Sequence, residues 1–293
     1  LNPKTTRMFR SPIFAALALT LAGPLAAPAQ DAPPVEAVNE AIDRGVRYLV
    51  SMQEPDGSWG SDYAYFPGDT SVGETALILA ALLHSGLKWE HQAIQRGVTY
   101  VRQTAPVKYY GACTRLLMEE ILLARRDDDH IEASTELILD GADRGYWDYP
   151  GDQMDLSNTQ YAVLGLWLAH QAGVKIPDKV YEKTMKVLIA HQREDGGWEY
   201  FGPIENENYR PGQVSIDQEG TATTSMTTAG MATLLFCYDV LVDRKKSNAK
   251  KFGADVEASM AKGYAWLDAH MTYTDNTAVG AQQQQNPNIW YYY

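Results

Sequence analysis

Cysteine is scarce in this sequence of 293 residues, which contains only Cys113 and Cys237. Two cysteines cannot form the disulfide framework that holds small exported domains together. Both lie in apolar stretches, so we predict buried free thiols. With 45% hydrophobic residues, the chain can instead bury a sizeable core.

Positive charge is also in short supply, because 25 lysines and arginines are outnumbered by 37 aspartates and glutamates, a net charge of -12. An acidic protein is repelled by phosphate backbones and anionic membranes, which argues against nucleic acid as a partner. The one basic cluster, within 244–251, is interpreted as a solvated link between helices.

Strand-like alternation is missing as well. Amphipathic runs with helical spacing alternate with runs that are apolar on every side. Val38, Ile42 and Val46 form one apolar stripe, whereas residues 75–83 (TALILAALL) have no polar face. We therefore predict an all-α protein without strands of any length. The predicted outer helices begin near residues 35, 91, 131, 178 and 252, and the buried inner helices near 75, 110, 157 and 224.

Residues 1–30 have the pattern of an export signal. Arg7 and Arg10 flank Met8, an apolar run covers 13–22, and small residues at 27–29 fit a cleavage site. We expect a periplasmic or secreted mature chain of one domain, 31–293. A retained membrane helix is the alternative, but no later run is judged long enough to span a bilayer, so the mature chain is not expected to be transmembrane.

A short motif occurs twice, as QEPDGSW from Gln53 to Trp59 and as QREDGGW from Gln192 to Trp198. A degenerate third copy ends at Trp147. We predict that Gly57, and Gly197 beside Gly196, let the chain turn off a helix, and that the tryptophan folds back over the turn. The glutamine amide is expected to satisfy unpaired backbone groups at the helix end.

This motif, placed between an amphipathic and an apolar helix, resembles the repeat of the prenyltransferase and squalene-oxidase group, which includes the terpene cyclases. The resemblance implies an α/α toroid, with inner and outer helices around a central apolar cavity, and it implies no cofactor. Residues 286–293 (NPNIWYYY) are the start of one more inner helix by this pattern, so we expect a toroid that is incomplete at its C-terminus.

The cyclases of this group that resemble squalene-hopene cyclase, which are isomerases, protonate their substrate with the middle acid of a DxDDT motif. The matching stretch here runs from Asp155 to Thr159 and reads DLSNT. Its first aspartate and its threonine match, but Ser157 stands where the proton donor is expected, and a hydroxyl cannot protonate an alkene. Ser157 with Gln160, like Ser71 with Glu74, instead fits a helix-capping box.

A second acidic stretch, at 217–222 (DQEGTA), is the other candidate for the proton donor. Asp217 and Glu219 are spaced as in the cyclase motif, with Glu219 in the middle position. The zinc site of protein prenyltransferases is excluded, because neither cysteine follows an aspartate by two residues. We therefore expect no metal.

Three functions remain open from the sequence. The first and favoured one is an exported toroid that binds an apolar or isoprenoid ligand, or a protein partner, without catalysis. The second is a terpene cyclase with a displaced proton donor. The third is a secreted carbohydrate-active (α/α) barrel, in which paired carboxylates such as Asp152 and Asp155 act on a sugar.

Overall fold

The computed structural model describes residues 34–60, 70–148, 153–204, 222–244, 247–272 and 278–279. Within these ranges the chain is mostly helical, so the all-α class is confirmed. The helices begin close to the positions that the apolar periodicity predicts. They are α2 (Val35–Ser51), α3 (Thr70–His84), α4 (Gln92–Gln103), α5 (Tyr109–Leu122), α6 (Asp128–Asp140), α7 (Leu156–Gln171), α8 (Asp178–His191), α9 (Thr224–Asp243) and α10 (Ser247–His270), with short 3-10 turns η2 (Leu123–Arg125) and η3 (Ala142–Arg144).

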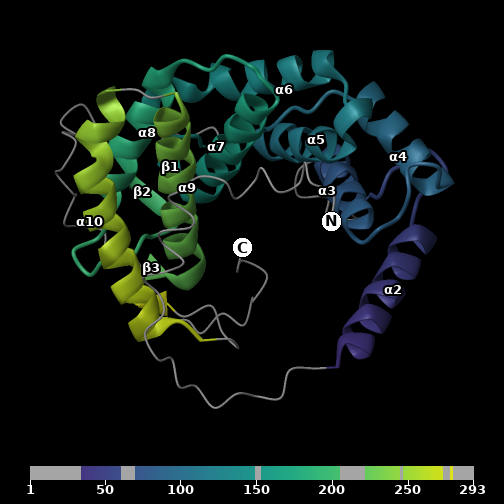
Figure 1. Ribbon diagram of the computed structural model, residues 1–293, viewed down its shortest axis with the longest axis horizontal. Coiled ribbons are helices and arrows are strands. Elements are labelled where there is room, and N and C mark those ends of the chain that lie inside the picture. The colour runs from purple at the N-terminus through teal and green to yellow at the C-terminus, as the bar shows by residue number, and fades with distance from the viewer. Residues whose placement is uncertain are drawn as a thin grey trace.

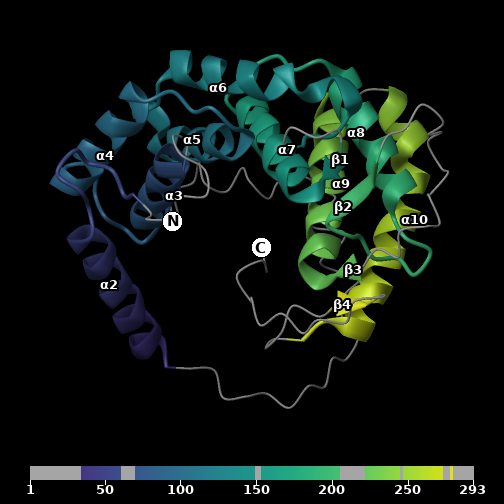
Figure 2. The same ribbon diagram turned by 180° about the vertical axis from the view of Figure 1, so that it is seen from behind.

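The helices form two rows that follow the same arc (Figure 1). In the inner row, α3 packs on α5, α5 on α7, and α7 on α9. The outer row consists of α4, α6, α8 and α10, and each of these contacts at least one inner helix. The reverse view in Figure 2 shows α2 at one end of the arc and α10 at the other.

Close packing of the inner helices, against each other and against a motif tryptophan, depends on glycine. A Cβ atom added at Gly165 of α7 would lie 3.3 Å from the Cα atom of Cys113 in α5. At Gly230 of α9, an added Cβ would lie 2.7 Å from the ring of Trp198. A larger side chain would collide with α5 at the first position and with the Trp198 ring at the second.

Four short strands within the described ranges correct the expectation that there are none. β1 (Gln153–Asp155) pairs antiparallel with β2 (Phe201–Ile204), and β3 (Ala222–Thr223) pairs antiparallel with β4 (Ala278–Val279). Ladders of two to four residues carry too little alternation to be recognised in a sequence. Their consequence is local, since β1 and β3 each lead directly into an inner helix.

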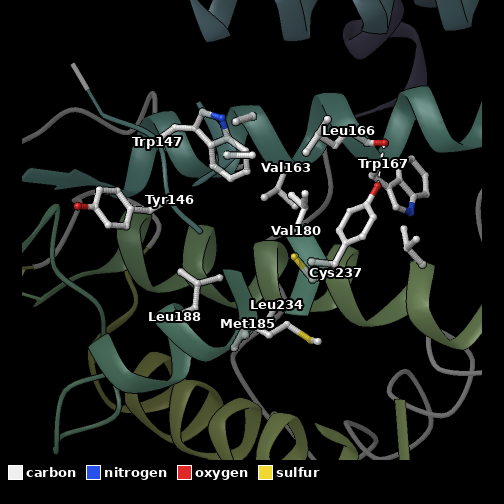
Figure 3. Packing of buried hydrophobic residues seen from close by; sticks show 14 of the residues in the cluster. Tyr146, Trp147, Val163, Leu166, Trp167, Val180, Met185, Leu188, Leu234 and Cys237 are labelled. Atoms are coloured by element: carbon white, nitrogen blue, oxygen red, sulfur yellow. Dashed lines mark hydrogen bonds between the residues drawn. The ribbon is translucent and has the colours of Figure 1, made fainter. Parts of the chain in front are cut away.

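The larger hydrophobic core contains buried residues from each of the helices α5 to α10. Figure 3 shows Val163 and Leu166 of α7 near Val180 of α8 and Cys237 of α9, with Trp147 at one side. Cys113 and Cys237 are both buried and free, as predicted. Burial raises the pKa of both thiols far above the ordinary cysteine value, which keeps them protonated and unreactive.

Helix α9 corrects a second expectation. Its segment Thr224–Val242 is apolar and long enough to cross a membrane by length and composition. It also packs against α7, α8 and α10, and most of it is buried inside the protein. The core helix of a soluble domain meets the same criterion, so this finding does not by itself indicate a membrane span.

The predicted export signal, 1–30, and the aromatic segment 286–293 lie outside the described residues. The same is true of Asp152, Asp217 and Glu219.

Candidate functional site at the start of helix α7

Each tryptophan of the repeated motif is fixed by two hydrogen bonds. The indole Nε1 donates to a carbonyl in the preceding helix: Leu49 for Trp59 at 2.7 Å, and Leu188 for Trp198 at 3.0 Å. The Trp59 ring is 4% exposed and the Trp198 ring 1%, so both are buried as predicted. Trp147 makes the same contact, to the Ile138 carbonyl at 2.7 Å.

The backbone N–H of each tryptophan donates to a threonine hydroxyl in the inner helix that follows. The threonines are Thr75 for Trp59, Thr159 for Trp147 and Thr227 for Trp198, at 2.9, 3.0 and 3.2 Å. Sequence analysis did not identify this partner, because the distance in sequence from tryptophan to threonine differs in the three copies. Thr159 is the threonine of the DLSNT stretch, so its match to the cyclase motif has a structural explanation.

The glutamines do not bond unpaired groups at their own helix end, which corrects that expectation. Gln53 Nε2 donates to the carbonyls of Gly57 and of Ala93 in α4, both at 2.9 Å. Gln192 Nε2 donates in the same way to Gly196 and to Ser259 in α10, also at 2.9 Å. Each glutamine therefore joins its turn to the next outer helix.

The glycine with a positive φ is Gly57 in the first motif and Gly196 in the second, at +95° and +97°. This corrects the choice of Gly197. A Cβ atom at Gly57 would lie 2.6 Å from the Arg96 carbonyl, and one at Gly196 would lie 2.5 Å from the Lys262 carbonyl. Glycine is needed at both positions for its backbone conformation and for the close approach of the next outer helix.

Two of these turns meet at the first residues of α7. The Asp155 N–H donates to the Trp147 carbonyl at 3.3 Å, and the Leu156 N–H donates to the Tyr200 carbonyl at 3.0 Å. Strand β1 ends at Asp155, where the strand pairing places it opposite Phe201. The start of α7 is thus held from both sides, which gives the DLSNT side chains fixed positions.

Asp155 is the N-cap of α7. Its Oδ1 accepts the Asn158 N–H at 2.9 Å and the Ser157 hydroxyl at 2.6 Å. The predicted capping box of Ser157 with Gln160 is therefore wrong, since a carboxylate one position outside the helix binds the free N–H group more strongly. Ser71 lies inside α3 and pairs with the Tyr100 hydroxyl at 2.8 Å, so it is not a cap either.

Ser157 connects this cap to the neighbouring turn. Its hydroxyl lies 2.9 Å from the Tyr200 hydroxyl. Because the Ser157 proton is donated to Asp155, the Tyr200 hydroxyl is the donor in this second bond. The three residues form a chain from Tyr200 through Ser157 to Asp155.

Two buried atoms at this site have no hydrogen-bond partner among the described residues, namely Asp155 Oδ2 and Asn158 Nδ2. Asp155 is 2% exposed and Asn158 1%. One atom is a charged acceptor and the other a neutral donor. Unpaired buried polar atoms are rare in native proteins, so this pair requires an explanation.

A second buried polar cluster lies between α4, α5 and α6, and sequence analysis missed it. Arg102 donates twice to Glu119, at 2.9 and 2.8 Å, and the Asp127 N–H donates to the same carboxylate at 2.8 Å. This bonding raises the pKa of Arg102, whereas burial lowers the pKa of Arg115. Glu119 could not be recognised as part of a polar cluster from the sequence, because it lies in a stretch predicted to be a buried inner helix. Both oxygens of the Glu119 carboxylate have a partner, so this side chain joins the three helices and is used for structure.

Among the described residues, no three His, Cys, Asp or Glu side chains gather closely enough to hold a metal ion. No protein-family model matches the chain, and no curated protein matches its sequence.

Proposed function

We propose that this protein is an α/α toroid that binds an apolar or isoprenoid ligand and does not cyclise it. The alternating rows of helices and the recurring tryptophan turns support the toroid, as does the resemblance of the motif to the squalene-oxidase repeat. The two rows curve around a common centre in Figure 1. The proposal includes export of the mature chain, on the pattern of residues 1–30.

The chemistry at position 157 is the observation on which the absence of catalysis rests. In the resembling cyclases, this position carries the acid that protonates the substrate. Here it carries a buried hydroxyl that is held between Asp155 and Tyr200 at 2.6 and 2.9 Å. Asp155 itself is committed to capping α7 through Oδ1. The same oxygen also accepts the Ser157 hydroxyl, so its hydrogen bonds go to the protein and not to a substrate.

Binding of squalene measures the first half of the proposal. The purified mature chain is titrated with squalene in detergent, and quenching of tryptophan fluorescence is followed. We expect saturable quenching together with a rise in the unfolding temperature, because a ligand that binds only the folded state stabilises it. Neither effect at squalene concentrations up to its solubility limit would reject an apolar-ligand toroid.

A further inference from the structure

The start of α7 contains complementary buried groups that no structural role uses. Asp155 Oδ1 completes the helix cap, but Oδ2 of the same carboxylate has no hydrogen-bond partner in the described part of the chain. Asn158 donates its backbone N–H to this cap, and its side-chain Nδ2 likewise has no partner among the residues that the structure describes. A buried polar atom without a partner costs about 1 to 3 kcal/mol, and more when it is charged. Two such atoms on neighbouring side chains point to a bound group.

The two atoms limit the chemistry of that group. A cation is disfavoured by the Asn158 amide, which presents hydrogen atoms. An anion is disfavoured by the Asp155 carboxylate. A hydroxyl satisfies both, because it donates one hydrogen bond and accepts another. The residues at the N-cap and at the third helical position are close enough for one small group to reach both, as the geometry of capping boxes shows.

The surroundings indicate what else the hydroxyl is attached to. Tyr161 follows Asn158 by three positions, so the two lie on the same side of α7. Its ring packs on that of Tyr110 in α5, with centroids 4.1 Å apart, and both side chains are only partly buried. Met154 and Leu156, on either side of Asp155, are buried and apolar. A polar pair beside apolar and aromatic surface fits an alcohol with a hydrocarbon body.

We infer that Asp155 and Asn158 form a binding site for the hydroxyl group of a lipid alcohol. The ligand alcohol donates to Asp155 Oδ2 and accepts from Asn158 Nδ2. The chain from Tyr200 through Ser157 holds Oδ1 in place, so Oδ2 is the free atom. This inference rests on the proposed function and specifies its ligand class, an isoprenoid alcohol rather than a plain hydrocarbon.

The test compares farnesol with β-farnesene, which has the same carbon chain without the hydroxyl. Affinities for the full mature chain are measured by tryptophan quenching. Each hydrogen bond contributes about 1 to 1.5 kcal/mol, so we expect farnesol to bind roughly tenfold or more tightly. This comparison uses the wild-type protein alone and does not depend on the folding of any variant.

Three variants then locate the hydroxyl. Asp155→Asn keeps an N-cap oxygen but replaces Oδ2 with a donor, and Asn158→Asp replaces the donor with an acceptor. Each single change should remove most of the preference for farnesol. The double variant Asp155→Asn/Asn158→Asp exchanges donor and acceptor, so it should regain the preference to within about threefold of wild type. Asp127→Asn, at the N-cap of outer helix α6, is the matched control and should keep it.

The outcomes separate the two proposals. Equal binding of farnesol and β-farnesene overturns the hydroxyl site and leaves the apolar-ligand toroid standing. If neither farnesol nor β-farnesene binds, and squalene does not bind either, both proposals are rejected. A preference for farnesol that persists in both single variants places the hydroxyl elsewhere and overturns the assignment to Asp155 and Asn158. Recovery in the double variant is not expected if buried water alone fills the site.

Discussion

The turn after α2 and the turn after α8 have the same hydrogen bonds in different surroundings. In both, a glutamine amide, a glycine with positive φ and a buried tryptophan occupy equivalent positions. Helix α8 buries five residues between its neighbours, whereas α2 buries none. Val35 is 69% exposed and Tyr48 62%. The motif therefore fixes the turn by itself, while neighbouring helices decide how much the repeat is stabilised.

The largest expected difference between these turns is in their tryptophans. Trp198→Ala should lower the free energy of unfolding by about 3 to 5 kcal/mol, because a fully buried ring leaves a cavity. Trp59→Ala should cost less, about 2 to 3 kcal/mol, because the open side next to α2 can relax into the space. Urea denaturation of both variants measures this. Equal losses for the two variants would contradict the expected difference between the two turns. A loss below about 1 kcal/mol for Trp198→Ala would show that the motif tryptophan does not stabilise the fold.

The glycine of the second turn offers a test with a close control. Gly196 and Gly173 have φ values of +97° and +101°, but only Gly196 approaches another helix. Gly173→Ala should cost about 1 to 2 kcal/mol from backbone strain alone. Gly196→Ala adds a collision with the Lys262 carbonyl, so we expect roughly 2 to 4 kcal/mol. Thermal denaturation shows which of the two variants is less stable. Similar losses of stability would show that α10 does not pack closely on Gly196.

The threonine that accepts the tryptophan N–H is expected to have a smaller effect. Thr227→Val leaves the buried Trp198 N–H without an acceptor, which should cost about 1 to 3 kcal/mol. Thr228, the next residue, donates only to carbonyls within α9, so Thr228→Val is the matched control and should cost under about 1 kcal/mol. Urea denaturation of Thr227→Val and Thr228→Val measures the two losses of stability. A control that is as destabilising as Thr227→Val would remove the special role of this hydroxyl.

The smallest expected effect is a pH dependence of the folding stability, which arises from Glu199 next to Trp198. Burial raises the pKa of Glu199 in the folded state above its ordinary value. The stability that its neutral form contributes is complete below the ordinary glutamate pKa and is lost as the pH rises through the folded pKa. Glu199→Gln should therefore be more stable than wild type at pH 7, by under about 1 kcal/mol, and equal to it near pH 3.5.

Exposed Glu194→Gln controls for the loss of one surface charge in this comparison. Melting temperatures across the range from pH 3.5 to 7 give the result. A gain for Glu199→Gln that is the same at both ends of the range would show that charge burial is not its cause.

These comparisons also show how far the sequence predicts the structure. The helices could be predicted from the spacing of apolar residues. A helix buried on one face and a helix buried all round differ in this spacing over many residues, so the signal is strong. The cap at Asp155 was mistaken for one at Ser157, since both residues are good caps and only the backbone decides which lies outside the helix. The unpaired atoms of Asp155 and Asn158 depend on three-dimensional packing, which no local pattern encodes.

We propose that this protein binds its ligand without cyclising it, because a hydroxyl stands at position 157. The most direct measurement is incubation of the chain comprising residues 31–293 with squalene at equal molar amounts, followed by extraction and gas chromatography with mass detection. We expect squalene to be recovered with its retention time unchanged. A cyclised isomer of the same mass that is absent with Glu219→Gln would contradict it, and would show that the acid is supplied from the 217–222 stretch.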